Sequence, residues 1–401
     1  MTLLQITNRI PYPLTDGGAI AVYNVTKYMH LAGNKVILAS LNTNKHYQEP
    51  SVMEEFAEVH TTNIKTDLSL LNAVSNLFFS SIPYNIQRFL SQEFSELLQK
   101  LIQKYNPDII QLEGLHLCLY IHAIQSVSKA PIILRAHNVE FEIWERLAKN
   151  EKNLLKKLYL KNLSKKIRKF EIDHINLLDG IIAISSKDAK QFLEWGFKGP
   201  ITYVPVGVSE KWLSQPLIFE EPIKKIGFLG SLEWLPNVQG LEWFLNNIWL
   251  EFHKNFPKIE LHIAGRNPSK KVLNWNYPNV KIHGEVPDAL KFLQQFSLLI
   301  VPLLSGSGMR VKVIESMALG KCIITSNVGA EGIEIENKKN ILIADTPQEW
   351  LNMLNLAVQN MNIIKEIGFN ARSFVKEHYQ WENLVCKMIN FYQQFNVLQN
   401  A

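Results

Sequence analysis

The sequence predicts an α/β protein with two domains, each built around a doubly wound parallel sheet. Short apolar runs alternate with helical patterns along most of the 401 residues. Most of these runs are continuously apolar rather than alternating, as in strands that are covered on both faces. The rhythm lapses once, near residues 208–223, and then restarts. A chain of this length can also form two domains, each with its own core.

The first half of the chain predicts an N-terminal domain over residues 1–207. Its expected strands are 2–8, 35–41, 56–62, 107–114, 130–138, 180–186 and 201–207. Its expected helices are 18–32, 91–105 and a long one near 151–178. This order of elements is typical of a βαβ fold with a parallel sheet.

Residues 208–223 mix Pro, Ser and acidic residues without periodicity, which favours a linker. A second domain is expected over 224–380. Its expected strands are 225–231, 258–265, 279–286, 297–304, 321–326 and 341–345. Helical stretches are expected at 348–360, 363–378 and 381–396.

Composition excludes several classes of protein. Hydrophobic residues make up 47% and charged residues 20%, as in soluble globular proteins. The net charge of +5 is mild and does not indicate a nucleic-acid binder. Three dispersed cysteines without CxxC spacing support neither a disulfide framework nor a zinc site. No signal peptide or membrane-spanning run is evident, so a cytoplasmic location is expected.

The segment after the strand at 297–304 carries the strongest signal for a ligand. Gly306, Ser307 and Gly308 remove side-chain bulk, and the cations Arg310 and Lys312 follow at the start of a helix. Ligands of such sheets bind beyond the carboxyl ends of the strands. Glycines permit close approach of a ligand, and a helix N-terminus favours an anion. These residues therefore indicate a phosphate site.

Glu315 follows one turn later, where its side chain can lean back toward the helix start. A carboxylate there suits sugar hydroxyls rather than phosphate. The alternative is that Lys312 and Glu315 form only a surface (i, i+3) pair worth a few tenths of a kcal/mol. A second loop with glycines, at 326–335, again follows an expected strand and favours the first interpretation.

Strand ends of the first domain offer further candidates. Asp16, Gly17 and Gly18 stand between the first strand and a helix, where they suit a phosphate or sugar, although a Gly-Gly turn can be purely structural. The dinucleotide fingerprint GxGxxG is absent. Other polar residues follow the strands at 130–138 and 107–114, and these candidates are His137, Asn138, Glu140, Glu113 and His116. An isolated histidine is more often structural than catalytic.

The run "GSGMRVKVIESMALGKCIITSNVGAEGI" resembles the nucleotide-sugar-binding segment of the GT-B-fold, retaining glycosyltransferases of family 4 (group 1). Similarity extends to "RAHNVEFEIWER", "GIIAISSKDAKQF" and "IGFLGSLEWLPNVQGLEWF". The resemblance implies two Rossmann-like domains facing a central cleft. It also implies that a C-terminal helix at about 381–401 packs back on the first domain.

The resemblance assigns roles on the donor side. Glu315 matches the family's ribose-binding glutamate, and Met309 and Val311 lie in the same donor segment. The family's other glutamate falls at Ser307, a departure shared by a subgroup with a G-S-G-x-R-x-K segment. The usual Arg and Lys after the first strand of the second domain are also missing. We therefore expect Arg310 and Lys312 to neutralise the donor diphosphate.

The resemblance also implies that His137 contacts the donor sugar and that the loop at 16–18 faces the diphosphate and the acceptor. The residues matched to the nucleobase site are Arg266, Asn267 and Val286. A UDP- or GDP-sugar is the expected co-substrate, without a further cofactor. No Asp-x-Asp follows a strand, so we expect no metal and a metal-independent reaction.

The resemblance thus implies retaining transfer of a sugar to a hydroxyl of a glycan or lipid-linked acceptor, in glycan or polysaccharide biosynthesis. Two alternatives stay open: a nucleotide-sugar epimerase of the same fold, and a non-catalytic nucleotide-sugar-binding partner. The lysine-rich stretch at 149–171 is either a solvated helix face or a surface for peripheral contact with anionic membrane lipid. The apolar stretch at 70–89 would extend such a surface.

Overall fold

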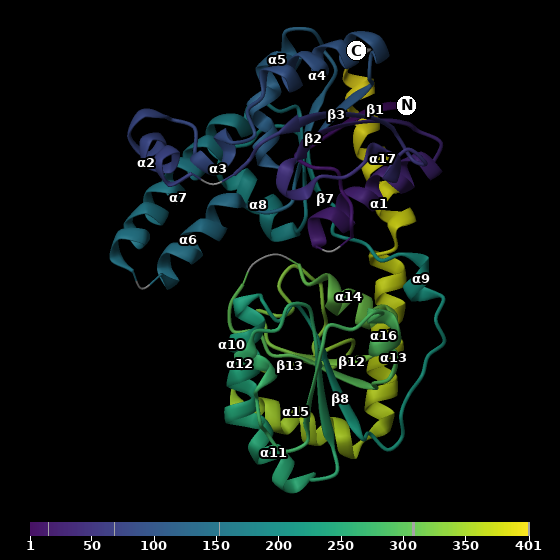
Figure 1. Cartoon of the computed structure of the whole chain (residues 1–401). Coiled ribbons are helices and arrows are strands. Elements are labelled where there is room, and N and C mark those ends of the chain that lie inside the picture. Colours follow the sequence, from purple (N-terminus) through teal and green to yellow (C-terminus); the bar gives the residue numbers. More distant parts are fainter. Residues whose placement is uncertain (15, 68, 152, 307–308, 400–401) are drawn as a thin grey trace. The chain divides into compact units, whose positions relative to one another are not determined.

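The computed structural model describes residues 1–14, 16–67, 69–151, 153–306 and 309–399 (Figure 1). The chain divides by its internal contacts into two units. Unit 1 comprises Met1–Val206 together with the chain from Leu384 onward, and unit 2 comprises Gly207–Asn383. Each unit contains a parallel sheet covered by helices, which confirms the predicted fold class.

The sheet of unit 1 has the strand order β3-β2-β1-β4-β5-β6-β7. Its strands are β1 (Thr2–Thr7), β2 (Lys35–Thr43), β3 (Glu58–Ile64), β4 (Ile109–Glu113), β5 (Ile132–Ala136), β6 (Gly180–Ala183) and β7 (Ile201–Tyr203). Every residue of β4, β5 and β6 is buried, which explains why these strands are mainly apolar.

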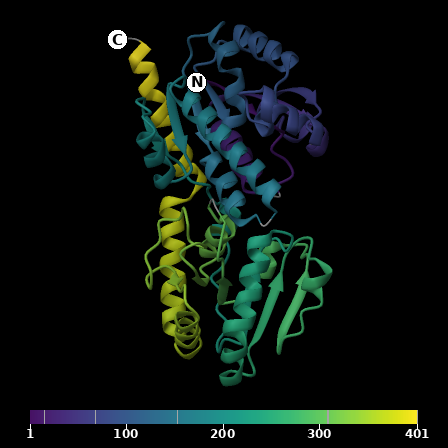
Figure 2. The same cartoon turned by 90° about the vertical axis from the view of Figure 1, so that its left-hand side faces the viewer.

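The helices of unit 1 include several that the sequence patterns did not reveal. They are α1 (Gly17–Leu31), α2 (Leu70–Phe79), α3 (Tyr84–Gln87), α4 (Gln92–Tyr105), α5 (Ile121–Gln125), α6 (Glu140–Asn150), α7 (Leu154–Ile175) and α8 (Ser186–Glu194). The last helix, α17 (Trp381–Gln399), packs against the same sheet from Leu384 onward, since a Cβ at Gly180 would lie 2.6 Å from the Phe395 ring. Figure 2 shows this helix in yellow, with the C-terminus at its end.

The sheet of unit 2 has the strand order β10-β9-β8-β11-β12-β13. Its strands are β8 (Lys225–Leu229), β9 (Glu260–Ala264), β10 (Val280–Gly284), β11 (Leu298–Val301), β12 (Cys322–Thr325) and β13 (Leu342–Ile343). Its helices are α9 (Glu210–Leu213), α10 (Leu235–Phe244), α11 (Leu250–Asn255), α12 (Lys270–Leu273), α13 (Ala289–Gln294), α14 (Val311–Ala318), α15 (Pro347–Gln359) and α16 (Met361–His378). Helix α9 is a single turn inside the segment that was predicted to be an irregular linker.

Capping residues account for several boundaries. The predicted strand at 180–186 ends early, because Ser185 caps α8 by accepting from the Asp188 N–H. Asp16 caps α1 in the same way. Thr346 and Glu349 form a reciprocal capping box at α15. These residues stop each strand or loop and begin the next helix at a defined position.

Two glycines of unit 2 permit close packing at the carboxyl edge of its sheet. A Cβ at Gly265 would lie 1.7 Å from the Gly230 carbonyl oxygen, and one at Gly240 would lie 2.1 Å from the Pro302 carbonyl oxygen. The residues that follow β8 and β9 can therefore approach one another, and the middle of α10 can approach the residues that follow β11, only because these two positions lack side chains. In the described part of the chain, no helix has the length and apolarity needed to cross a bilayer.

Candidate functional site

Unit 1 contains a cavity of about 480 Å³ at the carboxyl edge of its sheet. The walls come from the ends of β1, β2 and β4, the first turns of α1 and α6, and the segments that follow β1, β2, β3, α3, β4 and β5. The lining residues are Thr7, Asn8, Arg9, Pro11, Gly18, Ala19, Val22, Thr43, Lys45, His46, Thr66, Asp67, Arg88, Phe89, Glu113, His116, His137 and Glu140. Its polar, partly cationic lining suits a sugar or a phosphate-bearing ligand.

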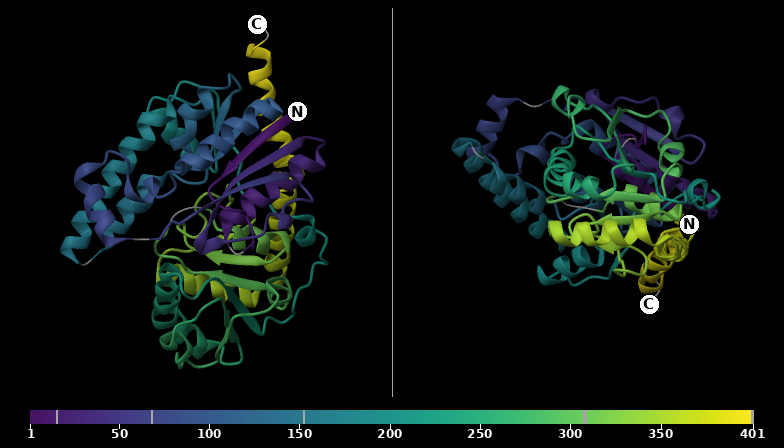
Figure 3. Two further views of the ribbon diagram at one scale, coloured as in Figure 1. Left: turned by 45° about the horizontal axis from the view of Figure 1, so that its top comes forward. Right: turned by 90° about the horizontal axis from the view of Figure 1, so that it is seen from below.

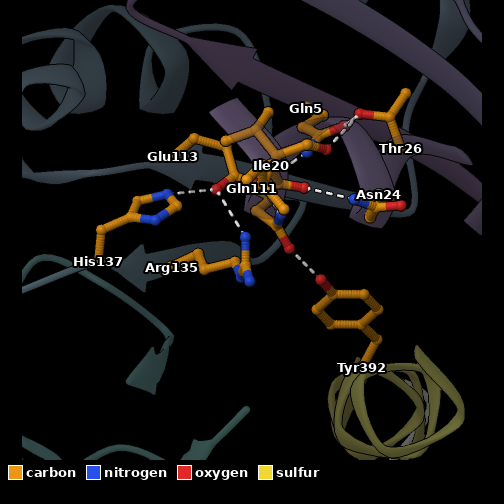
Figure 4. A network of polar contacts seen from close by, with 10 residues as sticks. Gln5, Ile20, Asn24, Thr26, Gln111, Glu113, Arg135, His137 and Tyr392 are labelled. Atoms are coloured by element: carbon orange, nitrogen blue, oxygen red, sulfur yellow. Dashed lines mark hydrogen bonds and ion pairs between the residues drawn. The ribbon is translucent and has the colours of Figure 1, made fainter. Parts of the chain in front are cut away.

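Glu113 lies at the centre of a buried polar network beside this cavity (Figure 4). Gln5 Nε2 donates to Glu113 Oε1 at 2.6 Å, and Gln111 Nε2 donates to the same oxygen. The other oxygen, Oε2, lies 2.8 Å from His137 Nε2 and 3.4 Å from Arg135 Nη1. The carboxylate is thus held by side chains of β1, β4 and β5 and by the residue that follows β5.

The strand register places these side chains on one face of the sheet. Gln5 is the partner of Gln111, and Glu113 is the partner of Arg135, in adjacent parallel strands. Alternation with a period of two then directs Gln111 and Glu113 to the same side. Helices close that side, because Thr26 of α1 donates to Gln5 Oε1 at 2.7 Å and Tyr392 of α17 donates to Gln111 Oε1.

The network fixes protonation states. Burial on its own would raise the pKa of Glu113, but the Arg135 charge and hydrogen bonds from His137 and Gln5 lower that pKa to about 2. An ionised Glu113 accepts only, so His137 Nε2 must carry a proton. In a neutral His137 ring Nδ1 is then an acceptor. His137 therefore meets the cavity in a defined orientation and tautomer.

Two other predicted residues that line the cavity, His116 and Glu140, have shifted pKa values. Burial and the nearby Arg88 charge lower the pKa of His116 to about 4, and its ring packs edge-on against Phe89. Burial raises the pKa of Glu140 to about 7. Beneath it, Glu171 accepts from the backbone N–H groups of Glu140 and Phe141 at the start of α6. Burial and the Glu140 charge raise the pKa of Glu171 to about 8.

The loop at 16–18 both begins α1 and contributes to the cavity wall. Asp16 binds Arg9 Nη2 at 2.7 Å and accepts from the Ala19 N–H at 3.0 Å. Burial would raise the pKa of Asp16, but these bonds outweigh it and lower that pKa. Gly17 begins α1 and Gly18 lines the cavity, so Asp16 holds Arg9 beside the glycines. Asn138 follows β5 and is partly buried, although it is not among the residues that line the cavity.

In unit 2, Arg310 stands at the start of α14, as the sequence predicts. Its guanidinium carbon lies 5.2 Å from the centroid of the Trp234 ring. Gly306 has φ +128°, and a Cβ there would lie 2.7 Å from Arg310 Nη2 and 3.0 Å from Trp234. Glycine at 306 therefore leaves room for the cation against the aromatic ring. Ser307 and Gly308 lie outside the described residues.

Lys312 and Glu315 form the (i, i+3) ion pair, with Nζ and Oε2 2.8 Å apart. Glu315 is buried, while Lys312 is partly exposed and lies 5.6 Å from the Trp212 ring centroid. The ion pair that the sequence suggested therefore forms, but only its lysine is exposed at the surface. Val311 begins the helix, and Met309 packs beside Gly332 of the second glycine-bearing loop.

The residues expected near the nucleobase follow β9 and β10. Asn267 has a left-handed backbone (φ 50°), and its amide donates to Glu233 Oε2 at 3.1 Å. The Leu232 N–H donates to the Arg266 carbonyl oxygen at 2.9 Å. Val286 is partly buried two residues after β10. The loop after β8 therefore contacts both groups: Glu233 accepts from Asn267, and Trp234 packs against Arg310.

Sequence reasoning missed several residues of these sites. Those of the Glu113 network are Gln5, Gln111, Arg135 and Tyr392, and those of the cavity wall include Arg9, Lys45 and Arg88. A signal for the first set exists, because Gln5 and Gln111 are each the third residue of the runs "LLQIT" and "IIQLE", and Arg135 is the fourth residue of "IILRA". Among the described residues, no group of three or more His, Cys, Asp or Glu has an arrangement that could hold a metal ion.

Comparison with known proteins identifies this arrangement. A model described as Glycosyltransferase Family 4 matches residues 15–212, and one described as Glycosyl transferases group 1 matches residues 223–360. A curated relative from Klebsiella pneumoniae, described as an uncharacterized 44.6 kDa protein in the cps region, is 24% identical over 94% of this chain and 96% of its own.

Solved structures show the same fold. Sucrose-phosphate synthase from Thermosynechococcus elongatus superimposes with a TM-score of 0.68 at 14% identity, over 99% of this chain and 100% of that one. Anabaena Alr3699/HepE in complex with UDP gives 0.68 at 10% identity, over 98% and 100%. These structures show the GT-B fold, and the two family models show that the protein is a glycosyltransferase. It belongs to the family 4, or group 1, glycosyltransferases.

Proposed function

We propose that this glycosyltransferase transfers a sugar from a nucleoside diphosphate to an acceptor hydroxyl with retention of configuration. The observation that carries the proposal is the placement of Arg310 against Gly306 and Trp234 at the start of α14. A planar guanidinium beside a helix N-terminus can bind two phosphate oxygens. The Anabaena relative's UDP complex supports a nucleotide donor, and a UDP- or GDP-sugar is the expected one.

Unit 2 binds the donor in this proposal. Arg310 and Lys312 neutralise the diphosphate, and Glu315 accepts from the ribose hydroxyls. Lys312 lies 2.8 Å from Glu315 and is partly exposed, so it can exchange the carboxylate for a phosphate oxygen when the donor binds. The ends of β9 and β10, with Arg266, Asn267 and Val286, take the nucleobase.

Unit 1 supplies the cavity for the transferred sugar and the acceptor. Glu113 orients His137, which contacts a hydroxyl of the donor sugar. Lys45 and Arg88 give the cavity wall positive charge, while the Arg9 charge is balanced by Asp16 and the Glu113 charge by Arg135. This wall favours a glycan or lipid-linked acceptor that carries a phosphate or other acidic group.

The chemistry needs no group beyond the co-substrate. The bond between the anomeric carbon and the diphosphate oxygen breaks, and its electron pair leaves with the diphosphate. The acceptor oxygen bonds to the same face of that carbon, and its proton passes to a phosphate oxygen. Preorganised cations stabilise the leaving charge without reorganisation, so the reaction is independent of added metal.

The description of the Klebsiella relative as a protein of the cps region favours a role in polysaccharide biosynthesis. A cytoplasmic location is part of the proposal. The free cysteines Cys118, Cys322 and Cys386 fit a reducing compartment.

A thermal-shift screen of nucleoside diphosphates and their sugars tests the donor. A ligand of the folded state raises the melting temperature by an amount that grows with the logarithm of its concentration divided by its Kd. We expect a response to UDP or GDP and their sugars, followed by acceptor-dependent transfer that EDTA leaves intact. Acceptor-independent conversion of the sugar would instead show an epimerase, and binding without turnover a non-catalytic partner.

Arg310→Ala tests the site. We expect kcat/KM to fall about 100-fold, the usual effect of losing one preorganised charge-stabilising donor. Lys224→Ala, an exposed cation of the same unit, is the matched control and should leave kcat/KM unchanged. Near-normal donor affinity and turnover in Arg310→Ala would refute this role.

A further inference from the structure

Helix α7 has an unusual distribution of charge. Residues 154–170 contain seven lysines and arginines and no acidic residue. Such a run is ordinarily a solvated helix face, with the lysines spread in water. Lysines alone would therefore support no more than that.

The exposed leucines of α7 argue against a purely solvated face. Leu160, Leu163 and Ile167 are buried, and the last two belong to the core of unit 1. The opposite face begins with Leu154, Leu155 and Leu158, which are 75%, 80% and 64% exposed. Exposure of clustered leucines to water is unfavourable, so their presence at one end of the helix indicates a binding partner.

The basic residues continue that same face. At helical spacing, Leu154 and Leu158 are followed by Lys161 and Lys165, with Lys169 one turn further. These three lysines are exposed, and no described residue forms an ion pair with them. Lys156 differs, because it binds Glu151 at 2.6 Å. The outer face of α7 therefore has an apolar start and a cationic continuation.

Helix α2 enlarges this surface. Lys166 Nζ donates to the carbonyl oxygens of Asn76, Leu77 and Ser80, each at 2.8 Å, and so joins the end of α2 to α7. Figure 1 and the left view of Figure 3 both show α2 beside the α6–α7 pair. Leu71 and Phe79 of α2 are 83% and 86% exposed.

We propose that the outer face of α7, together with α2, docks on an anionic lipid bilayer. Leu154, Leu155 and Leu158 enter the headgroup region, and Lys161, Lys165 and Lys169 face the lipid phosphates. The leucines add apolar contact with the headgroup region and the lysines add attraction to anionic lipid, and both contributions strengthen binding to a membrane surface. Each lysine near an anionic surface contributes about 1 kcal/mol. This inference does not depend on the proposed donor or acceptor.

Co-sedimentation of the full chain with lipid vesicles tests the proposal. We expect binding to vesicles that contain phosphatidylglycerol, weak binding to phosphatidylcholine alone, and loss of binding at high salt. Absence of binding to the anionic vesicles at low salt overturns the proposal. In that case the exposed leucines would instead indicate a protein partner at this face.

Two variants locate the surface. The triple change Lys161→Glu, Lys165→Glu and Lys169→Glu should weaken vesicle binding about 100-fold or more, from about 1 kcal/mol per lysine. A second triple change, Leu154→Ser, Leu155→Ser and Leu158→Ser, should weaken it while keeping the charge. Unchanged binding in either variant overturns the assignment.

The matched control reverses the same number of charges elsewhere. Lys224, Lys258 and Lys376 are exposed residues of unit 2, and their replacement by Glu gives the same net charge. We expect this variant to bind vesicles nearly as well as the parent. An equal loss in the control would show non-specific attraction and contradict the proposed surface. All the substituted side chains are exposed, so melting curves should stay close to the parent's.

Discussion

Each unit holds a buried glutamate near the carboxyl edge of its sheet, but the two are held in different ways. Glu113 is bound by Gln5, Arg135 and His137, which come from other strands or their ends. Glu315 is bound by Lys312, three residues away on the same helix. Glu113 therefore depends on the assembled sheet, whereas Glu315 depends mainly on one helix turn.

The partners also differ in burial. Arg135 is almost fully buried, while Lys312 remains partly exposed. A buried charge without its partner is costly, but an exposed lysine can exchange a carboxylate for water or for a phosphate at little cost. The Glu113 network is thus preorganised, and the Lys312–Glu315 pair can rearrange around a ligand.

Glu113→Gln should have the largest effect on stability. It leaves the Arg135 charge buried without a counter-charge, and breaking such a pair costs about 3–5 kcal/mol of unfolding free energy. Denaturant titration measures the loss. The double variant with Arg135→Met should recover part of it, because both charges are then gone. A loss below about 1 kcal/mol in Glu113→Gln would contradict the contrast between the two glutamates.

The stability of unit 1 should also depend more strongly on pH than that of unit 2, because of Glu171. Its pKa in the folded chain is about 8 against an ordinary 4.5, so the folded state holds a proton that the unfolded state releases. The stability from this group is complete below about pH 4.5 and falls as pH rises toward 8. Glu171→Gln mimics the protonated form. Its melting temperature should exceed the parent's at pH 9 and match it at pH 4.5.

Equal pH dependence of melting in the parent and Glu171→Gln would rule out this protonated carboxyl. Glu171→Ala is a useful companion. It also removes the acceptor for the Glu140 and Phe141 N–H groups, so its stability should lie below that of Glu171→Gln at both pH values.

Tyr392→Phe should have a smaller effect. It removes the hydroxyl that donates to Gln111 and keeps the ring that packs α17 on the sheet. Loss of one buried hydrogen bond costs about 1 kcal/mol, and the unpaired Gln111 oxygen can raise the cost somewhat. Denaturant titration measures it, with the exposed Tyr47→Phe as the control. No loss would show that Gln111 is oriented by the strands alone.

Glu315→Gln should change stability least, by less than about 1 kcal/mol, because Lys312 stays hydrated. Donor affinity should fall more than stability, since the ribose loses a charged acceptor. Calorimetric titration with the responding nucleoside diphosphate measures the affinity. A stability loss as large as that of Glu113→Gln would remove the distinction between the two sites.

Local chemistry in the sequence determined much of this protein. Mainly apolar runs marked β4, β5, β9 and the other covered strands, since a strand buried on both faces consists largely of apolar residues. Gly306, Arg310 and Glu315 marked the start of α14, because a tight turn, a cation and a helix lie within ten residues. The His137 and Glu113 positions were also evident, as polar residues that follow or end apolar strands.

Only the tertiary structure decided how these residues are held. Gln5 and Glu113 are 108 positions apart, and Tyr392 and Gln111 are 281 apart. Such pairs depend on strand order and register, and many other pairings are compatible with the same local patterns. The raised pKa of Glu171 likewise depends on its burial beneath α6, which no periodicity of α7 indicates. The sequence by itself therefore placed the candidate residues at strand ends, while long-range packing set their partners and charge states.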